Sequence, residues 1–245
     1  MRVFLLRRDE WSGNVYKLSK KERNYLFSVL RLHVNDTFTA KDCAENYYKA
    51  FLFDEETITL EHTDNPEETL LDGLSSYKGP FADLAMYISV LKGKKNETEI
   101  RMLTEIGVKE IILIETEFVQ DNLNAHALER IKLIIREAVQ QSGSREPVLR
   151  GPMSFEEAIE EEEKGRILIL HQSMLTSSVS IKQAISDCTQ SDRIAAFIGP
   201  EGGFSDKECS LALSKGALPV LLQTNILRAE TAAVYTAAAI QTLIH

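Results

Sequence analysis

The strongest constraint on the fold is a repeated alternation of two hydrophobic patterns between residue 82 and the C-terminus. Five nearly continuous apolar runs, which are typical of buried strands, are each followed by a segment with helical periodicity. The apolar runs are ADLAMYISVL (82–91), KEIILIE (109–115), RILILH (166–171), RIAAFIG (193–199) and LPVLLQ (218–223). This order predicts an α/β fold in which a parallel sheet is covered by helices on both faces.

The N-terminal part of the chain follows a different pattern. Short alternating runs predict strands, and Ser19 with Glu22 forms a capping box that predicts one helix. The strand runs are RVFLL (2–6), DTFTAKD (36–42), NYYKAFLF (46–53) and TITLEHT (57–63). The polar segment 62–79 is rich in turn residues and is typical of a linker. We therefore predict a small β-rich domain over residues 1–70 and an α/β domain over residues 71–245.

Composition and charge limit the class of protein. No apolar run reaches the roughly 18 residues needed to span a bilayer, and the N-terminus lacks a signal-peptide core, so we expect a cytoplasmic protein without a membrane partner. Cys43, Cys188 and Cys209 have neither disulfide-framework nor zinc-site spacing, and no metal is predicted. The net charge is -9, but residues 1–50 carry ten Lys or Arg against six Asp or Glu. Such a local basic excess is suited to phosphate contacts.

The glycine-rich turn GPEGGFSDKE (199–208) directly follows one of the apolar runs. In parallel sheets of this kind, ligands bind outside the carboxyl ends of the strands. No Lys follows the glycines, which argues against a triphosphate-binding loop. Glu201 inside the turn would repel a phosphate and suits a ligand with positive or hydroxyl groups. The alternative is a plain strand-to-helix turn, since Ser205 and Glu208 form a capping box.

A second unusual segment, LLQTNILRAETAAVYTAAAI (221–240), follows the last apolar run. It predicts a helix that begins near Ala229 and places Glu230 and Thr231 in its first turn, where the helix dipole favours an anion. Its many alanines allow a neighbouring backbone to approach closely. A buried C-terminal helix alone would not account for Arg228 beside Glu230 at a strand-to-helix junction.

Together these segments resemble the RsmE family, the 16S rRNA (uracil-3-N) methyltransferases of the SPOUT class. The resemblance rests on FIGPEGGFSDKE (197–208), ILRAETAAVYTAAA (226–239), LTEIGVKEIIL (103–113), ERIKLIIREAVQQSGSREPVL (129–149) and SVLRL (28–32), and it extends over nearly the whole chain. It implies a PUA-like RNA-binding β-barrel over residues 1–70 and a SPOUT domain over 71–245. The last segments of that domain would form a trefoil knot around S-adenosylmethionine. It also implies a homodimer that methylates N3 of a specific uridine in the 16S rRNA of the small ribosomal subunit.

The resemblance implies a set of cofactor-binding residues. These are Leu170, His171, Gln172, Ile198, Gly199, Pro200, Glu201, Gly203, Leu222, Gln223, Ile226, Leu227, Arg228, Thr231 and Ala232. Uridine N3 must lose its imide proton before it becomes a good nucleophile. Arg228 is predicted to stabilise the resulting charge on the uracil carbonyls, and either Glu230 or Glu201 is predicted to accept the proton.

RNA contacts are predicted from basic residues of both domains. These are Arg7, Arg8, Lys20, Arg23, Arg31, Lys92 and Lys94. Four places depart from the family pattern: Gln223 stands where the family usually has glycine, the stretches 92–100 and 116–120 are altered, and Asn24-Tyr25 replaces a paired histidine. A catalytically silent RNA-binding SPOUT protein is therefore an alternative, against which Arg228 and Glu230 argue. A nucleotide-binding hydrolase or regulator is a further alternative, disfavoured because no Walker lysine or nucleophile–histidine pairing is readable.

Overall fold

The computed structural model of the chain describes residues 3–7, 11–42, 44, 46–64, 81–119, 123–162, 165–171 and 177–244. The chain divides into two compact units, one of residues 1–78 with 139–143 and one of residues 79–138 with 144–245. The predicted boundary near residue 70 lies outside the described residues, as do Arg8, Cys43 and Gln172. None of the helices in the described ranges combines the length and apolar character needed to cross a bilayer.

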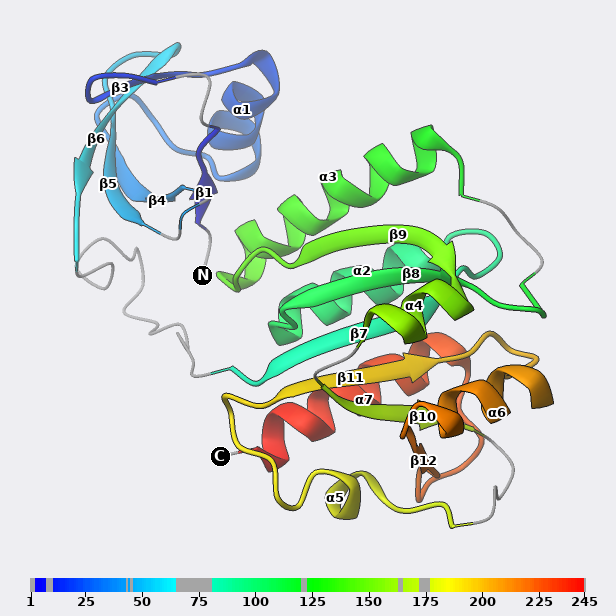
Figure 1. Cartoon of the computed structure of the whole chain (residues 1–245). Helices are drawn as coiled ribbons and strands as arrows, with labels where there is room; N and C mark the ends of the chain where they lie inside the picture. Colours follow the sequence, from blue (N-terminus) through cyan, green and yellow to red (C-terminus); the bar gives the residue numbers. More distant parts are fainter. Residues whose placement is uncertain are drawn as a thin grey trace. The chain divides into compact units, whose positions relative to one another are not determined.

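The first unit is built on a six-stranded sheet that curls into a barrel-like form (Figure 1). Across the sheet the strands are β1 (Phe4–Leu5), β4 (Thr37–Lys41), β5 (Tyr47–Leu52), β6 (Thr57–His62), β3 (Val15–Lys17) and β2 (Trp11–Ser12). Pairing is antiparallel except between β1 and β4. The sequence predicted four of these strands. It did not reveal β2 and β3, because two- and three-residue strands are too short to show alternation.

The helical segment of the first unit is fixed by a buried carboxylate. Ser19 and Glu22 form the predicted capping box of α1 (Lys20–Asn24), which continues as a π-helical turn over Tyr25–Val29. Glu22 also accepts a hydrogen bond of 2.9 Å from the Tyr16 hydroxyl and lies 3.3 Å from Arg7 Nε. Burial, together with the charge of Glu22, raises the pKa of Tyr16. The polar cluster thus ties α1 to β3 inside the apolar core.

The second unit contains a six-stranded parallel sheet. Across it the strands are β12 (Leu218–Val220), β10 (Arg166–Leu170), β11 (Arg193–Ile198), β7 (Asp83–Ser89), β8 (Glu110–Glu115) and β9 (Val148–Ser154). All neighbours run parallel, and the five predicted strands are present. The sequence did not predict β9 because this edge strand is only partly buried and contains Gly151 and Pro152, which weaken a strand pattern.

Helices cover both faces of this sheet (Figure 1). They are α2 (Lys95–Ile106), α3 (Ala125–Ser142), α4 (Phe155–Glu161), α5 (Ile181–Ala184), α6 (Asp206–Ser214) and α7 (Ala229–Leu243). On one face, Phe155 of α4 and Cys209 of α6 share a core with Phe197 of β11. On the other, α7 packs against α2 and contacts β7 and β11.

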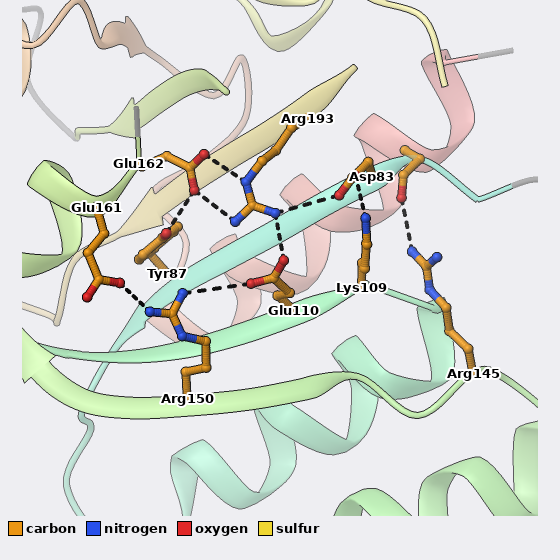
Figure 2. Close-up of polar contacts among 10 residues, drawn as sticks. Asp83, Tyr87, Lys109, Glu110, Arg145, Arg150, Glu161, Glu162 and Arg193 are labelled. Carbon is orange, nitrogen blue, oxygen red and sulfur yellow. Dashed lines mark hydrogen bonds and ion pairs between the residues drawn. The ribbon is translucent and has the colours of Figure 1, made fainter. Parts of the chain in front are cut away.

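An ion-pair network links residues near the amino-terminal ends of the strands (Figure 2). Arg193 donates from Nε to Glu162 Oε1 at 2.7 Å, from Nη2 to Glu162 Oε2 at 2.9 Å, and from Nη1 to Glu110 Oε1 at 2.6 Å. The hydroxyl of Tyr87 donates to the same Glu162 carboxylate at 2.8 Å, and burial with this contact raises the pKa of Tyr87. Because Arg193 and Glu110 begin their strands, the network lies at the edge of the sheet opposite the carboxyl ends.

Candidate cofactor and catalytic site

The carboxyl ends of β10, β11 and β12 meet at one edge of the sheet and border a cavity of about 120 Å³. Its lining comes from the strand ends, the glycine turn, the loop after β12 and the first turn of α7. The lining residues are Leu170, His171, Ile198, Gly199, Pro200, Gly203, Val220, Leu221, Leu222, Thr224, Asn225, Ile226, Leu227, Ala229 and Ala232. Most of them are apolar, so the cavity suits a ligand with an apolar part.

Ten of the fifteen residues that the sequence predicted for cofactor binding line the cavity. The ten are Leu170, His171, Ile198, Gly199, Pro200, Gly203, Leu222, Ile226, Leu227 and Ala232. Glu201, Gln223, Arg228 and Thr231 are exposed and do not line it. The remaining lining residues, which are not among these fifteen, are Val220, Leu221, Thr224, Asn225 and Ala229. β12 ends at Val220, three residues earlier than its apolar run, so Leu221 and Leu222 belong to the loop that borders the cavity.

The turn after β11 requires glycine at two positions for different reasons. Gly203 donates its backbone N–H to Pro200 O at 2.8 Å and has a φ of +74°, which L side chains rarely adopt. A Cβ on Gly199 would lie 3.0 Å from the carbonyl carbon of Gly203 and 3.3 Å from the Phe204 ring. The turn therefore folds back tightly on itself and leaves its backbone open to the cavity. Ser205 and Glu208 then form the predicted capping box of α6.

A charged cluster lies beside the cavity and is centred on Lys95, the first residue of α2. Lys95 forms an ion pair with Glu201, which raises the pKa of Lys95 and lowers that of Glu201. The charges of Glu230 and Arg228 also act on Lys95. The three predicted catalytic residues, Glu201, Glu230 and Arg228, are thus gathered around one lysine. Lys95 was not predicted as a site residue, because in the run KGKK (92–95) it cannot be distinguished from the neighbouring lysines.

The last two predicted catalytic residues sit at the start of α7. Arg228 is the N-cap residue, is exposed, and accepts the N–H of Ala232 with its carbonyl at 2.8 Å. Glu230 is half-buried in the first turn, as predicted. Its Oε2 atom is buried and has no hydrogen-bond partner among the described residues. A buried carboxylate oxygen without a partner is costly, so this atom is available to accept a hydrogen bond from a bound molecule.

A further carboxyl group, Glu99 of α2, lies in the same cluster. It is 1% exposed, and burial raises its pKa to about 8, with further contributions from the charges of Glu230 and Glu201. Asn96 Nδ2 donates to Glu99 Oε2 at 3.1 Å and to Ser89 O at 3.0 Å. Glu99 was not predicted as a site residue. The sequence did contain an indication of its burial. Glu99 lies with Ile100 and Leu103 on the face of the helix that the apolar periodicity assigns to the core, where a carboxyl group is unusual.

The residues predicted to contact RNA are placed as follows. In the first unit Lys20 and Arg31 are exposed, whereas Arg23 pairs with Glu56 at 3.2 Å and Arg7 is engaged by Glu22. In the second unit Lys92 and Lys94 are exposed in the segment that precedes α2. Lys20, Arg31, Lys92 and Lys94 therefore present their charges to solvent.

Comparisons with known proteins identify the class of protein to which this fold and site belong. Residues 78–241 match the family model described as an RNA methyltransferase domain. The ribosomal RNA small subunit methyltransferase E of Synechocystis is 30% identical over 93% of this chain and 73% of the relative. That of Aquifex aeolicus is 28% identical over 92% of this chain and 93% of the relative. The chain belongs to the ribosomal RNA small subunit methyltransferase E (RsmE) family, which confirms the resemblance found in the sequence.

A solved structure shares the whole fold. The ribosomal RNA small subunit methyltransferase E from Neisseria gonorrhoeae, bound to S-adenosyl methionine, has a TM-score of 0.79 and 23% sequence identity to this chain. The match covers 100% of this chain and 98% of the other. Both units described above are therefore present in that protein.

Proposed function

We propose that this protein transfers a methyl group from S-adenosylmethionine to N3 of a specific uridine in the 16S rRNA of the small ribosomal subunit. The observation that carries the proposal is the cavity at the carboxyl ends of β10, β11 and β12, with the charged cluster of Lys95, Glu201, Arg228 and Glu230 beside it. Membership of the RsmE family supports the reaction class.

The residues present fit S-adenosylmethionine, which supplies an electrophilic methyl group on a sulfonium cation. The apolar walls suit an adenine ring, and the turn around Gly199 and Gly203 leaves backbone groups free to approach a ligand. Glu201 and Glu230 provide carboxylates that can contact the positive and hydroxyl groups of this ligand. The glycine turn lacks the lysine of a triphosphate-binding loop, which argues against the hydrolase alternative.

The structure favours Glu230 over Glu201 as the group that takes the N3 proton. Glu201 is paired with Lys95, and this contact lowers its pKa, which makes it a weaker proton acceptor. Glu230 has a buried oxygen without a hydrogen-bond partner in the part of the chain described. In the proposed mechanism N3 gives its proton to Glu230, and Arg228 stabilises the negative charge that spreads onto the uracil carbonyl oxygens.

The finer architecture belongs to the same proposal. We propose that residues 1–70 form a PUA-like RNA-binding barrel and that residues 71–245 form a SPOUT domain with a C-terminal trefoil knot. The last strand, β12, pairs with β10 on the side away from β11, and this crossover supports the knot. Tyr235 and Leu243 of α7 are 46% and 45% exposed, which supports a homodimer that covers this helix. Such a protein would act in the cytoplasm, where the ribosomal subunit is.

The proposal is tested by methyl transfer from tritium-labelled S-adenosylmethionine to small ribosomal subunits that lack the modification. We expect label in 3-methyluridine of the 16S rRNA, identified after nuclease digestion, and a separate reaction with naked 16S rRNA tests the form of the substrate. Binding of both cofactor and subunit without transfer would instead establish the catalytically silent alternative. Label on another atom or nucleotide would contradict the N3 assignment.

Binding to rRNA should weaken steeply with salt. The exposed Lys20 and Arg31 of the first unit and Lys92 and Lys94 of the second are positioned to displace counterions from phosphates. Neutralising Lys20 and Arg31 together should lower the slope of log affinity against log salt by about one to two, measured by filter binding. Glu56→Gln, which frees Arg23, is the matched control and should leave affinity equal or higher. An unchanged slope would remove these residues from the interface.

Gly199→Val should weaken S-adenosylmethionine binding at least about tenfold, because the added side chain must displace the Gly203 backbone 3.0 Å away. Gly203→Val should do the same through strain at its positive φ. Calorimetric titration measures both effects, with circular dichroism as a check on folding. Gly216→Asn is the control, because that turn has a φ of +83° that Asn tolerates and open space around its Cβ. Unchanged affinity in folded variants would remove the turn from the site.

A further inference from the structure

An aromatic side chain, Phe118, stays largely exposed in the loop that follows β8. Because β8 runs parallel to β11, with β7 between them, this loop leaves the sheet at the same edge as the glycine turn. The side chain of Phe118 is 45% exposed, although an aromatic ring gains much from burial. Phe118 is not among the described residues that line the cavity, so the proposed cofactor site does not account for it.

The backbone holds Phe118 in place on both sides. The N–H of Glu117 donates to Glu208 Oε1 at 2.8 Å, and the N–H of Val119 donates to the carbonyl of Thr116 at 3.1 Å. Glu208 belongs to the capping box of α6 and is only 4% exposed. The exposed ring is therefore anchored to the body of the unit, and a group that is already positioned loses little conformational freedom when it binds a partner.

The ring of Phe118 also packs on the glycine turn that borders the cavity. A Cβ on Gly202 would lie 3.2 Å from Cβ of Phe118 and 3.5 Å from Cδ2 of its ring. The residue before Gly202 is Glu201, which pairs with Lys95, and the residue after it is Gly203, which lines the cavity. Phe118 thus lies at the rim of the proposed site, on the turn that carries one of the charged residues.

We propose that Phe118 is a substrate-binding residue whose ring stacks on a base of the rRNA strand next to the target uridine. The inference rests on the proposed function, since it names a contact for the RNA that this function requires. A base that enters an active site leaves the stack of its neighbours, and the bases beside it then have faces without a partner. An exposed aromatic ring offers such a partner to any base, because every base has a π-face.

The binding test uses filter binding to small ribosomal subunits and to naked 16S rRNA. Phe118→Leu keeps an apolar side chain against Gly202 and removes the ring, so its affinity for both should fall about tenfold. Phe118→Tyr keeps the ring and should bind within about twofold of the wild type. Because stacking displaces no counterions, the slope of log affinity against log salt should not change in Phe118→Leu, whereas Lys92→Ala should lower it by about one.

Kinetics and cofactor binding separate stacking from structural support of the turn. In Phe118→Leu, single-turnover methyl transfer at saturating subunit should stay within about threefold of the wild type, while the subunit concentration that gives half the maximal rate rises about tenfold. Calorimetry should show unchanged affinity for S-adenosylmethionine. Leu213→Ala, at a position of α6 that is 41% exposed and has no assigned role, is the control and should match the wild type in every measurement.

Three results would overturn the inference. Equal RNA affinity in the wild type and Phe118→Leu would show that the ring makes no contact with the substrate. A loss confined to small subunits, and absent with naked rRNA, would place a ribosomal protein against the ring instead. An equal loss of S-adenosylmethionine affinity would assign the ring to support of the turn. Failure of the proposed function is distinguishable from all three, because the wild type itself would then transfer no methyl group to small subunits.

Discussion

Arg228→Ala should reduce methyl transfer to small ribosomal subunits by about a hundredfold, with cofactor affinity changed little. Loss of the N3 proton spreads negative charge over two uracil carbonyl oxygens, and a guanidinium offers them donors in a fixed fork. These donors gain most when the charge is fullest, so they favour the transition state over the bound substrate. A hundredfold loss corresponds to about 2.7 kcal/mol, comparable with removal of one oxyanion donor. Single-turnover rates with saturating cofactor measure the effect.

The exposure of Arg228 at the N-cap of α7 makes a purely structural role easy to separate from the catalytic one. Its backbone carbonyl, not its side chain, accepts the N–H of Ala232, and that contact survives substitution. Arg228→Lys should restore only part of the rate, because an ammonium lacks the fork. Arg101→Ala, at an exposed arginine of α2 to which no role is assigned, is the control and should leave the melting temperature unchanged. A normal rate in Arg228→Ala would end the catalytic assignment.

Periodicity was enough to predict the central part of the fold. The strands β7, β8, β10, β11 and β12 are buried on both faces and therefore appear in the sequence as apolar runs. The edge strand β9 and the short β2 and β3 carry no such pattern, because exposure and brevity remove it. Local capping signals were equally dependable, since the predicted boxes of Ser19 and Ser205 are both formed.

Some residues of the site could be predicted from local sequence motifs, and others come together only through the packing of the fold. The glycine turn and the junction at Arg228 are contiguous motifs, so the sequence pointed to most of the cavity lining. Lys95 and Glu99 belong to α2, more than a hundred residues from Glu201 and Glu230, and only the packing of α2 on α7 brings these groups together. No spacing rule connects such distant positions. For this reason the sequence left the choice between Glu201 and Glu230 open, and the ion pair with Lys95 supplied the reason to prefer Glu230.

Arg193→Ala should lower the free energy of unfolding of the second unit by about 3–5 kcal/mol and leave the cavity unchanged. Arg193 supplies three hydrogen bonds to Glu162 and Glu110 at the opposite edge of the sheet (Figure 2). Glu162 is only 5% exposed, and removal of its cation leaves a buried charge whose remaining described partner is the Tyr87 hydroxyl. Breaking a buried pair from one side costs this much because the orphaned charge keeps its desolvation penalty. We expect a fall of about 10 °C in the melting temperature of this unit, measured by scanning calorimetry.

Two further variants identify the orphaned charge as the cause. Glu162→Gln in the Arg193→Ala background removes the buried charge and keeps an acceptor for Tyr87, so it should recover part of the lost stability. Arg166→Ala removes an ion pair to Asp187, whose side chain is 67% exposed, and should cost less than about 1 kcal/mol. Cofactor affinity at a temperature well below the transition should equal that of the wild type in all three variants, since the cavity lies at the other edge of the sheet. A drop no larger than that of Arg166→Ala would show that Glu162 is solvated and that the network does not hold the sheet together.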